Sequence, residues 1–585
     1  MLPSAPVSRR GVLAGSAAVT GAGALATTVA TPALASTPGR RVAVLGGGMA
    51  GLTAAHELAE RGFKVTVYEP TAWGGKARSI PDPGTATGTR RDLPGEHGFR
   101  FFPGFYHHVP DTMRRIPFGK GTVFDHLVPA MGAKFLRAGD HADGFLFGIG
   151  PDPTQLLSID YLRRFLTDSL AGSGVPPQEL SYFIERLLVF VTSCDERRLG
   201  EWEKVSWWNF IKAGQHSTEY QRVLAAGLTR NLVAAKEKIA SARTIGNMGE
   251  AFVYSIMGRG SNGAPDRVLD LPTNEAWINP WMKQLRALGI TFVPGQKLLR
   301  YEVAGGRVTG AVLTDRAGRR TTVHADWYVS AMPVERVVPT LTAPVLALDP
   351  RLGRLKRLFT DWMVGIQYFL YDSPNITQGH ISFMDAPWAL TALTQGQFWT
   401  ARNLPRDYGD GKVKDILSVD ISDWDSPGLL FKKPAKECTR AEVAREVLHQ
   451  IRMHHTAGDQ LPAGIVHSWF MDPAIKWHPA RHRNTNDTPL LVNTVDSWKD
   501  RPTAHTAIPN LFLSGDFVRT NIDLATMEGA NESARDAVNA ILAASGSSAV
   551  PAAKYELYKP PEFEALKAVD KVLFQAGQKN ALDLG

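Results

Sequence analysis

The stretch Arg41–Arg78, RVAVLGGGMAGLTAAHELAERGFKVTVYEPTAWGGKAR, decides the fold of this chain. Arg41–Leu45 is a short run of β-branched and apolar residues, which is typical of a buried parallel strand. A turn with the glycine spacing G-x-G-x-x-G follows, and then a helical pattern that ends at Gly62. A second strand, Lys64–Glu69, ends in a carboxylate. The sequence therefore predicts a strand–turn–helix–strand unit that binds a dinucleotide.

Each glycine of the first turn has its own task in this prediction. Gly46 permits the tight turn, Gly48 lets the backbone approach a diphosphate, and Gly51 lets the helix pack closely on the sheet. Free N–H groups and the positive end of the helix dipole would hold the diphosphate. Glu69 is placed to accept a hydrogen bond from a ribose 2′-OH. The conjunction of strand, turn, helix and carboxylate favours dinucleotide binding over an ordinary βαβ unit.

A second glycine turn lies at Gly74-Gly75-Lys76-Ala77-Arg78. Two glycines would bring the backbone near the cofactor, and the Arg78 side chain can reach a phosphate. A surface loop can have the same composition, and both interpretations stay open here. The next segment, Glu96–Tyr106, is an aromatic cluster that contains glycines. It is either plain core or the lining of a flavin and substrate cavity.

Composition excludes several classes of protein. The chain has 585 residues, of which 44% are hydrophobic and 21% charged, so it is a well-cored globular protein of two or more structural units. Its formal charge of +8 is spread out without a long Lys/Arg block, which argues against nucleic-acid binding. Weak attraction to anionic membranes stays open. The pairs His107-His108 and His454-His455 are adjacent and cannot share one helical face, so no metal site is expected.

The N-terminus resembles a twin-arginine export signal. Arg9 and Arg10 precede a mildly apolar run rich in Ala, Gly and Thr, and Ala33-Leu34-Ala35 forms an A-x-A cleavage pattern. An uncleaved membrane anchor fits less well, because the run is weakly apolar. We therefore expect residues 1–35 to be removed and the protein to be extracellular or in the cell envelope.

The middle of the chain predicts helices and two further groups of strands. Apolar residues recur at helical spacing in Gln178–Cys194 and Glu219–Ala235, where they form either a helical core or a lipophilic tunnel or membrane face. A helix over Asn279–Gly289 should precede strands at Ile290–Val293, Leu298–Val303, Arg307–Leu313 and Arg320–Ser330. Strands such as Met363–Tyr371 and Ile416–Ile421, with a helix at Arg440–Met453, predict a second sheet.

The C-terminal region, like the beginning of the chain, predicts a buried strand followed by a helix. Asn510–Asp516 is a buried strand that runs into Gly515 and Asp516, and Asp516 can hydrogen-bond a ribityl hydroxyl or order the phosphate end. Thr526 should cap a helix whose first N–H groups, including that of Met527, can face the flavin pyrimidine and stabilise negative charge. Tyr555–Leu582 contains a possible amphipathic helix, for which docking onto the body is favoured over membrane or partner contact.

The motifs GGGMAGL, GGKARS, EHGFRFF, NLFLSGD and TMEGA together resemble the flavin-containing amine oxidase and carotenoid desaturase superfamily. EHGFRFFPGFYHHV and SGDFVRTNIDLATMEGANESAR are most similar to its phytoene and ζ-carotene desaturase branch. The likeness is sharp over 41–110 and 490–543 and moderate over 270–335. It implies an α/β fold: a GR2-type Rossmann-like FAD-binding domain with an inserted α+β substrate domain. Non-covalent FAD is expected, since the C-terminal motif has no cysteine.

The resemblance also implies domain boundaries and cofactor contacts. The expected parts are a signal peptide at 1–35, FAD-binding parts at 36–110, 266–340 and 486–545, substrate-domain parts at 111–265 (helical) and 341–485 (sheet), and a tail at 546–585. The expected FAD contacts are Gly46, Gly48, Met49, Ala50, Gly51, Glu69, Gly74, Gly75, Lys76, Arg78, Gly98, Phe99, Arg100, Leu298, Gly515, Asp516 and Met527. Leu298 stands where the family usually has a valine that holds adenine through its backbone.

The resemblance leaves three functions open. The leading hypothesis is FAD-dependent dehydrogenation of a lipophilic, isoprenoid-like substrate by hydride transfer to flavin N5, with O₂ or a quinone as electron acceptor. The alternative is an exported amine or amino-acid oxidase that uses O₂ and releases peroxide. It would need an aromatic sandwich and a lysine-held water, and the candidates are Trp469, Lys476, Trp477 and Trp498. A flavin-bearing binding module without turnover is the third.

Two residues are candidates for the chemistry itself. Arg100 stands where the desaturases have histidine, and it would steer an anionic group or the flavin charge. Glu528 would order the flavin end of the site. Either side chain can instead be structural.

Overall fold

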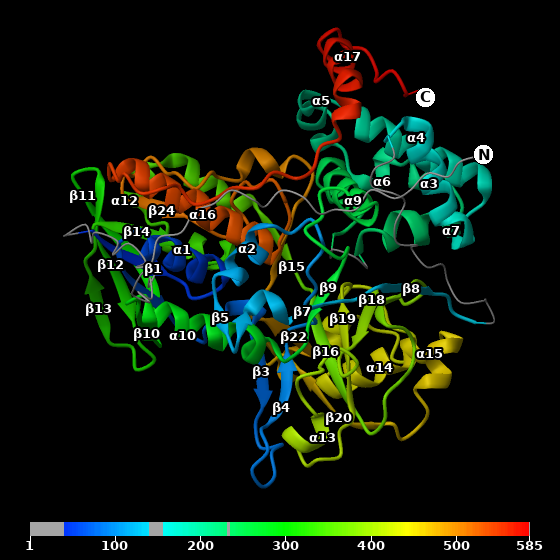
Figure 1. The fold of residues 1–585 in the computed structure, drawn as a ribbon, viewed down its shortest axis with the longest axis horizontal. Helices are drawn as coiled ribbons and strands as arrows, with labels where there is room; N and C mark the ends of the chain where they lie inside the picture. The colour runs from blue at the N-terminus through cyan, green and yellow to red at the C-terminus, as the bar shows by residue number, and fades with distance from the viewer. Residues whose placement is uncertain (1–39, 140–155, 231–234, 584–585) are drawn as a thin grey trace, which may run out of the picture.

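The computed structural model describes residues 40–139, 156–230 and 235–583. The expected signal peptide, 1–35, lies outside the described residues. Figure 1 shows a layered α/β body on the left, a helical body at the upper right, and a second sheet with its own helices at the lower right. The predicted α/β class is confirmed, because the left-hand body takes its strands and helices from three separate stretches, 41–69, 279–330 and 511–544, and the chain between them builds most of the other two bodies.

The left-hand body is built on a five-stranded parallel sheet in the order β10-β2-β1-β14-β24. The strands are β1 (Arg41–Leu45), β2 (Lys64–Glu69), β10 (Thr291–Pro294), β14 (Trp327–Ser330) and β24 (Leu511–Leu513). Helix α1 (Met49–Glu60) follows β1 and packs against α16 (Met527–Ala544), which follows β24. The apolar residues of β1 are buried because the central strand of a parallel sheet is covered on both faces.

One predicted strand was wrong. Arg320–Ser330 is not continuous: β13 (Arg320–Val323) pairs with β12 (Arg307–Thr314), and β14 joins the parallel sheet. Strand β11 (Lys297–Ala304) completes an antiparallel three-stranded sheet with β12 and β13. The Asp326 carboxylate, between the two pieces, accepts a hydrogen bond of 2.7 Å from the Arg41 N–H. A β-forming pattern does not reveal where a strand changes its partner.

The helical body has its own hydrophobic core. Its helices are α3 (Ile159–Leu170), α4 (Pro177–Thr192), α5 (Asp195–Gly200), α6 (Trp207–Phe210), α7 (Thr218–Tyr220) and α9 (Ala242–Ile256). Helix α4 confirms the predicted helix at Gln178–Cys194, and its Phe183, Ile184 and Leu188 are buried in that core. The helix predicted at Glu219–Ala235 is shorter: α7 runs into a π-helical turn at Gln221–Gly227, and 231–234 lie outside the described residues.

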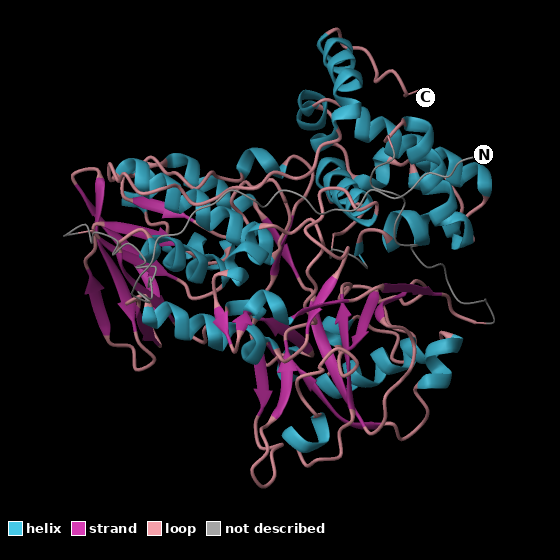
Figure 2. Ribbon diagram, viewed as in Figure 1, coloured by secondary structure: helices cyan, strands magenta, loops and turns pink. Residues whose placement is uncertain are grey.

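The predicted second sheet is confirmed and has six strands in the order β20-β16-β19-β18-β17-β8. They are β8 (Gly132–Leu136), β16 (Val364–Leu370), β17 (Gly379–Phe383), β18 (Leu390–Thr394), β19 (Asp415–Ile421) and β20 (Val466–Met471). Helices α14 (Arg440–Arg452) and α15 (His455–Gln460) accompany it, and a capping box of Thr439 and Glu442 begins α14. Figure 2 shows this sheet and the helical body as separate regions.

Short elements complete the chain. They are β3 (Ser79–Asp82), β4 (Leu93–Glu96), α2 (His108–Arg114), β5 (Pro117–Phe118), β6 (Gly121–Thr122), β7 (Leu127–Pro129), β9 (Arg267–Leu269), α10 (Asn279–Ala287), α11 (Val334–Val337), α12 (Ala343–Leu348), β15 (Phe359–Asp361), α13 (Leu404–Asp407), β21 (Ile475–His478), β22 (Arg483–Asn486), β23 (Leu490–Val492) and α17 (Glu564–Gln575).

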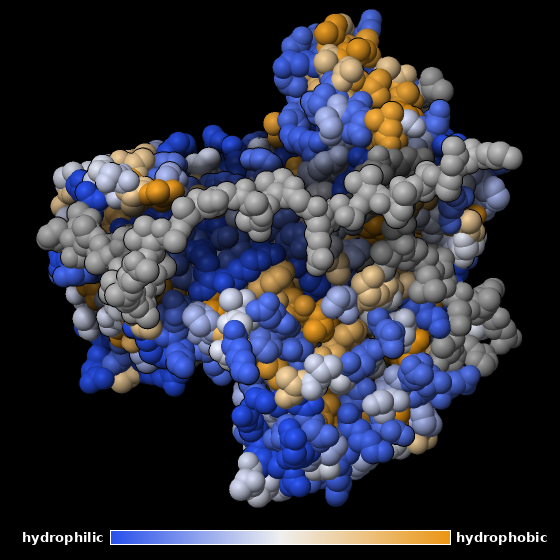
Figure 3. All heavy atoms as spheres, in the orientation of Figure 1, coloured by the Kyte–Doolittle hydropathy of each residue, from blue (hydrophilic) through white to orange (hydrophobic). Residues whose placement is uncertain are grey.

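Helix α17 docks on the helical body through a polar residue. Asp570 is 1% exposed and its carboxylate accepts a hydrogen bond of 2.9 Å from Arg197 Nε of α5. The predicted docking onto the body is therefore confirmed, although on the apolar side of the helix Leu566, Val569 and Val572 are exposed and only Leu573 is half-buried. Figure 3 shows hydrophobic residues gathered at the α17 end of the molecule. None of the helices in the described part of the chain has the length and apolar character needed to cross a bilayer.

Candidate cofactor and active site

The two glycine turns lie back to back. The Gly74 N–H donates to the Gly47 carbonyl at 2.8 Å. A Cβ on Gly75, whose φ is +58°, would lie 2.9 Å from the Gly48 Cα, and a Cβ on Gly51 would lie 1.9 Å from the Gly46 carbonyl oxygen. Larger residues would push these backbones apart. The turns therefore form a surface of bare backbone, which suits close approach of a diphosphate.

The first turn of α1 has backbone N–H groups without acceptors among the described residues. Its N-cap is Gly48, without a side-chain cap, and its first turn has no acidic residue. Among the described residues, the N–H groups of Met49 and Ala50 have no acceptor. Orphan N–H groups and the helix dipole attract an anion. These residues fit the diphosphate of FAD.

Glu69 braces the first turn. Its Oε2 accepts a hydrogen bond of 2.8 Å from the Gly47 N–H, and its Oε1 accepts bonds of 2.8 and 2.7 Å from the N–H and hydroxyl of Thr71. The predicted contact with a ribose hydroxyl stays a prediction. The structure adds a second task, since the same carboxylate holds the turn in shape.

Arg100 ties the second glycine turn to the Glu96–Phe102 segment. Its guanidinium donates to the Gly98 carbonyl at 2.5 Å, to the Phe99 carbonyl at 3.2 Å, and to the Lys76 carbonyl. Burial lowers the pKa of Arg100, with Glu96 and Asp420 acting in the opposite direction. Arg78 behaves similarly, donating to the Gly75 carbonyl at 2.5 Å. Both arginines hold backbone oxygens, so anion steering by Arg100 and phosphate binding by Arg78 stay predictions.

A small cavity with a mixed polar and apolar lining lies beside Arg100. Its lining residues are Glu96, Arg100, Val268, Leu269, Leu271, Thr273, Leu393, Gln395, Phe398 and Trp399. The Glu96 carboxylate accepts hydrogen bonds of 2.9 Å from the Ser79 hydroxyl and the Thr273 N–H. Next to the cavity, the rings of Phe99 and Phe101 each contact His380. The aromatic residues of this segment are therefore core, and the segment lines the cavity only through Glu96 and Arg100.

Asp420 of β19 lies against Gly98. A Cβ on Gly98 would lie 2.3 Å from Asp420 Oδ1, and a Cβ on Gly365 would lie 2.8 Å from the same oxygen. Burial raises the pKa of Asp420 to about 7, although Arg100 and His380 lower it. Among the described residues, Asp420 Oδ1 accepts no hydrogen bond. No sequence signal marks this residue, because its strand has the pattern of a core strand.

His97 and Asp472 form a second polar pair that the sequence analysis did not single out. His97 Nδ1 lies 2.7 Å from Asp472 Oδ2, and His97 Nε2 is buried without a hydrogen-bond partner among the described residues. The only sequence signal was the position of His97 inside the EHGFRFF motif. Asp472 follows β20, 375 positions away, and no local pattern marks it.

The C-terminal part of the site lies at the ends of β24 and α16. Gly515 has a φ of +152°, and its N–H donates to the Ser533 hydroxyl at 2.9 Å. The Asp516 carboxylate accepts no hydrogen bond among the described residues, which leaves it available for a hydroxyl. Thr526 caps α16 as predicted, since its hydroxyl accepts a bond of 3.0 Å from the Gly529 N–H. The Met527 N–H has no acceptor in the described part of the chain, as a contact to the flavin pyrimidine requires.

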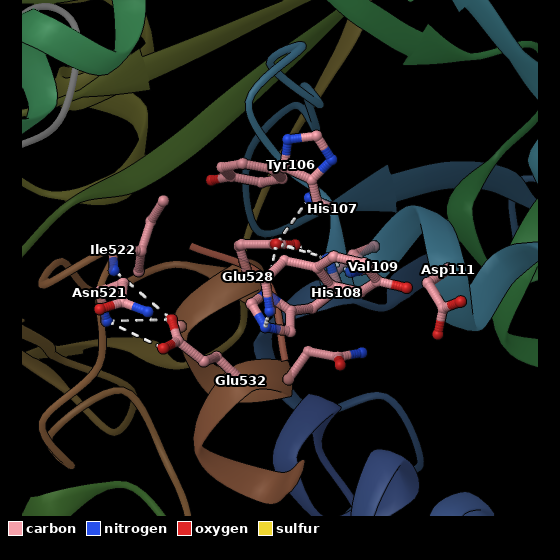
Figure 4. A network of polar contacts seen from close by, with 12 residues as sticks. Tyr106, His107, His108, Val109, Asp111, Asn521, Ile522, Glu528 and Glu532 are labelled. Carbon is pink, nitrogen blue, oxygen red and sulfur yellow. Dashed lines mark hydrogen bonds and ion pairs between the residues drawn. The ribbon is translucent and has the colours of Figure 1, made fainter. Parts of the chain in front are cut away.

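Glu528 joins α16 to the start of α2. Its Oε1 accepts hydrogen bonds from the N–H groups of His107 (2.7 Å) and His108 (2.6 Å), and from His108 Nδ1 (2.8 Å). Its Oε2 accepts one of 2.8 Å from the Val109 N–H (Figure 4). Burial would raise the pKa of Glu528, but these hydrogen bonds and His108 hold it below its usual value. The carboxylate caps a helix and orders this end of the site.

The candidates for an amine-binding cage each have separate partners. Lys476 pairs with Asp487, and Trp477 contacts His482. The Arg243 guanidinium carbon lies over Trp498, 4.0 Å from the centroid of the tryptophan ring. Trp469 packs on the core of the six-stranded sheet. No polar or ring contact joins any two of the four among the described residues.

The remaining predicted residues are placed as follows. Leu298 is the second residue of β11, at an irregularity in its ladder with β12 between Leu298 and Arg300. Lys76 Nζ donates to the Pro489 carbonyl and lies 3.6 Å from Glu335. Within the described residues, no three potential metal ligands come together.

Comparisons with known proteins agree with this geometry. Residues 44–116 match the family described as an NAD(P)-binding Rossmann-like domain, and residues 301–542 match the flavin containing amine oxidoreductases. The zeta-carotene desaturase of Synechocystis is 24% identical over 561 residues, which cover 86% of this chain and 97% of that protein. The carotenoid phi-ring synthase of Chlorobaculum tepidum is 24% identical over 51% of this chain, and the match spans only 42% of its length.

Solved structures share the fold. The cyclohexylamine oxidase of Brevibacterium oxydans matches with a TM-score of 0.55 at 12% identity, over 87% of this chain and 99% of its own. An oxidoreductase of Methanosarcina mazei matches with a TM-score of 0.53 at 13% identity, over 86% and 100%.

These findings support the flavin-containing amine oxidase and carotenoid desaturase superfamily, and they indicate that the protein is an oxidoreductase enzyme with a flavin cofactor. The predicted enzyme class is therefore confirmed, and the comparisons support the predicted superfamily. The matched segments include the two glycine turns and the Gly515–Met527 region, which are the segments that fit FAD.

Proposed function

We propose that the protein removes two hydrogens from a lipophilic, polyene-like substrate, using non-covalently bound FAD. The observation that carries the proposal is the similarity to a zeta-carotene desaturase, which extends over 86% of this chain and 97% of that protein. The small cavity beside Arg100 has a mixed lining: Val268, Leu393, Phe398 and Trp399 are apolar, and Glu96, Arg100, Thr273 and Gln395 are polar.

Non-covalent binding is supported by the cysteines. Cys194 lies in the helical body and Cys438 beside the six-stranded sheet, and both are buried. Burial raises the pKa of Cys194 to about 11 and that of Cys438 to about 12. Buried thiols with raised pKa values are poor nucleophiles, and neither lies in the segments that fit FAD.

The test is anaerobic reduction of the FAD-loaded protein. Polyenes and isoprenoids in detergent, and in parallel a panel of amines and amino acids, are mixed with the enzyme while the absorbance of oxidised flavin is followed. Bleaching by an apolar compound supports the proposal. Bleaching by amines alone, with peroxide formed when O₂ is admitted, would replace it with an amine oxidase. That second candidate is favoured by the match of residues 301–542 to the flavin containing amine oxidoreductases.

We also propose export by the twin-arginine pathway. The support is the Arg9-Arg10 pair with the cleavage pattern at Ala33-Leu34-Ala35. A variant with both arginines replaced by lysine should stay in the cytoplasm with its flavin bound. Equal export of this variant and the wild type would contradict the proposal.

A further inference from the structure

His97 is held in one orientation by a carboxylate that is itself fixed. Asp472 Oδ2 lies 2.7 Å from His97 Nδ1, while Asp472 Oδ1 accepts a hydrogen bond of 2.7 Å from the Ala474 N–H. Arg440 fixes the backbone of the same segment by donating to the carbonyls of Asp472 (3.1 Å) and Ile475 (2.7 Å). A carboxylate on one ring nitrogen selects the tautomer that carries its proton there, and the other nitrogen then presents a lone pair.

The free nitrogen of His97 is an exception that needs an explanation. His97 is 8% exposed, and its Nε2 is buried without a partner among the described residues. Buried polar atoms are normally hydrogen-bonded. Two further orphans lie beside it, Arg100 Nε in the same segment and Asp420 Oδ1 against Gly98. Several unsatisfied polar atoms in one place indicate that a bound molecule completes this region.

The charges around His97 favour the neutral ring. Burial lowers the pKa of His97, Asp472 raises it, and the cations Arg100 and Lys76 lower it. Asp472 itself has a pKa below its usual value: burial raises it, but His97 and Arg78 outweigh this. The balance keeps His97 uncharged at neutral pH beside an ionised carboxylate, which is the state of a proton acceptor.

We propose that His97 Nε2 accepts the substrate proton, with Asp472 as its positioning residue. This inference rests on the proposed function. When two hydrogens leave neighbouring atoms of the substrate, one goes as a hydride, with its electron pair, to the oxidised flavin. The other leaves as a proton to His97 Nε2, and the electron pair of that broken bond becomes the new double bond. His97 then gives its proton to water, and the electron acceptor reoxidises the flavin.

The test compares the FAD-loaded wild type with His97→Gln, Asp472→Asn and a matched control, His454→Gln. His454 is also a buried histidine, with Nδ1 2.9 Å from the Gln450 carbonyl and Nε2 unpartnered, but it lies next to α15 in the substrate domain. Three quantities are measured for each protein: the FAD dissociation constant, the rate of anaerobic flavin reduction between pH 5 and 9, and the ¹⁵N shifts of the His97 ring.

We expect His97→Gln to bind FAD within about twofold of the wild type while flavin reduction slows about 10²–10⁴-fold. The wild-type rate should fall at acid pH, below the ordinary histidine pKa of about 6.5, and the variant should lose this limb. Asp472→Asn should move the His97 proton from Nδ1 toward Nε2 and should therefore also slow reduction, because a protonated Nε2 cannot accept the substrate proton. His454→Gln should match the wild type.

Three results would overturn the inference. These are an unchanged reduction rate or acid limb in His97→Gln, a parallel loss of FAD and rate in that variant, or a wild-type His97 that is charged at pH 7. The ring shifts need no substrate, so they decide the geometry even if nothing reduces the flavin. Failure of every substrate with the wild type would instead overturn the proposed function.

Discussion

We predict that replacing Glu528 by glutamine strongly lowers the free energy of unfolding. Its carboxylate caps the start of α2, accepting N–H groups of His107, His108 and Val109 together with the His108 ring, and it is 2% exposed. In Glu528→Gln the amide oxygen can accept the hydrogen bonds that Oε1 accepts in the wild type. The amide NH₂ then takes the place of Oε2, and because it is a donor it cannot accept the Val109 N–H. Leaving that buried donor unpaired costs about 2 kcal/mol, and exchanging charged for neutral acceptors costs about 2 kcal/mol more.

The expected loss of unfolding free energy is therefore about 4 kcal/mol at pH 7. The pKa of Glu528 is lower in the folded protein than the unfolded value of about 4.3. Its contribution is thus fully present above that pH and is lost as pH falls through the folded pKa. The gap between wild type and variant should be constant from pH 5 to 8 and should narrow below about pH 4.

The assay is urea unfolding followed by tryptophan and flavin fluorescence at several pH values. The control is Glu564→Gln, an exposed carboxylate that pairs with Lys567 at 3.2 Å in the first turn of α17. An exposed pair of this kind is worth less than about 1 kcal/mol. A loss in Glu528→Gln no larger than the control's, or a gap that does not respond to acid, would refute the capping role.

Three other changes have defined outcomes. Gly75→Ala should abolish FAD binding, because the new Cβ would lie 2.9 Å from the Gly48 Cα. The control is Gly84→Ala, at a glycine that also has a positive φ (+81°) but has open space around it. Absorbance should show that this control still binds one FAD per chain. Arg100→Ala should reduce flavin content and turnover by the same factor, since its guanidinium holds backbone carbonyls of two loops; turnover falling alone would restore a catalytic role. Asp570→Asn should release α17 from Arg197, costing about 3 kcal/mol, and protease should then cut the C-terminal tail first.

Local sequence patterns were enough to predict the nucleotide-binding unit. The Gly46–Gly51 turn, the helix after it and the strand ending at Glu69 are each encoded within about thirty residues. The break inside Arg320–Ser330 was not predictable in this way, because β13 pairs with the neighbouring β12, whereas β14 pairs with β1 and β24, which are distant in sequence.

The side-chain partners of the site were harder to predict than its position. Arg100 bonds to the carbonyl of Lys76 in the second glycine turn, and Glu528 bonds to N–H groups about 420 positions away. Asp472 reaches His97 from the end of β20 in the second sheet. Such pairings depend on how the bodies of the protein meet, and composition and periodicity carry no record of that.

The order of strands in the parallel sheet has a consequence for biosynthesis. Strand β24, which pairs with β14, begins only at Leu511, and the helix that follows supplies Met527. A ribosome must therefore emit the chain beyond Met527 before this half of the flavin pocket exists. Until then the two glycine turns exist without β24 and the start of α16, which complete the site. Messages truncated before codon 511 should thus yield colourless products.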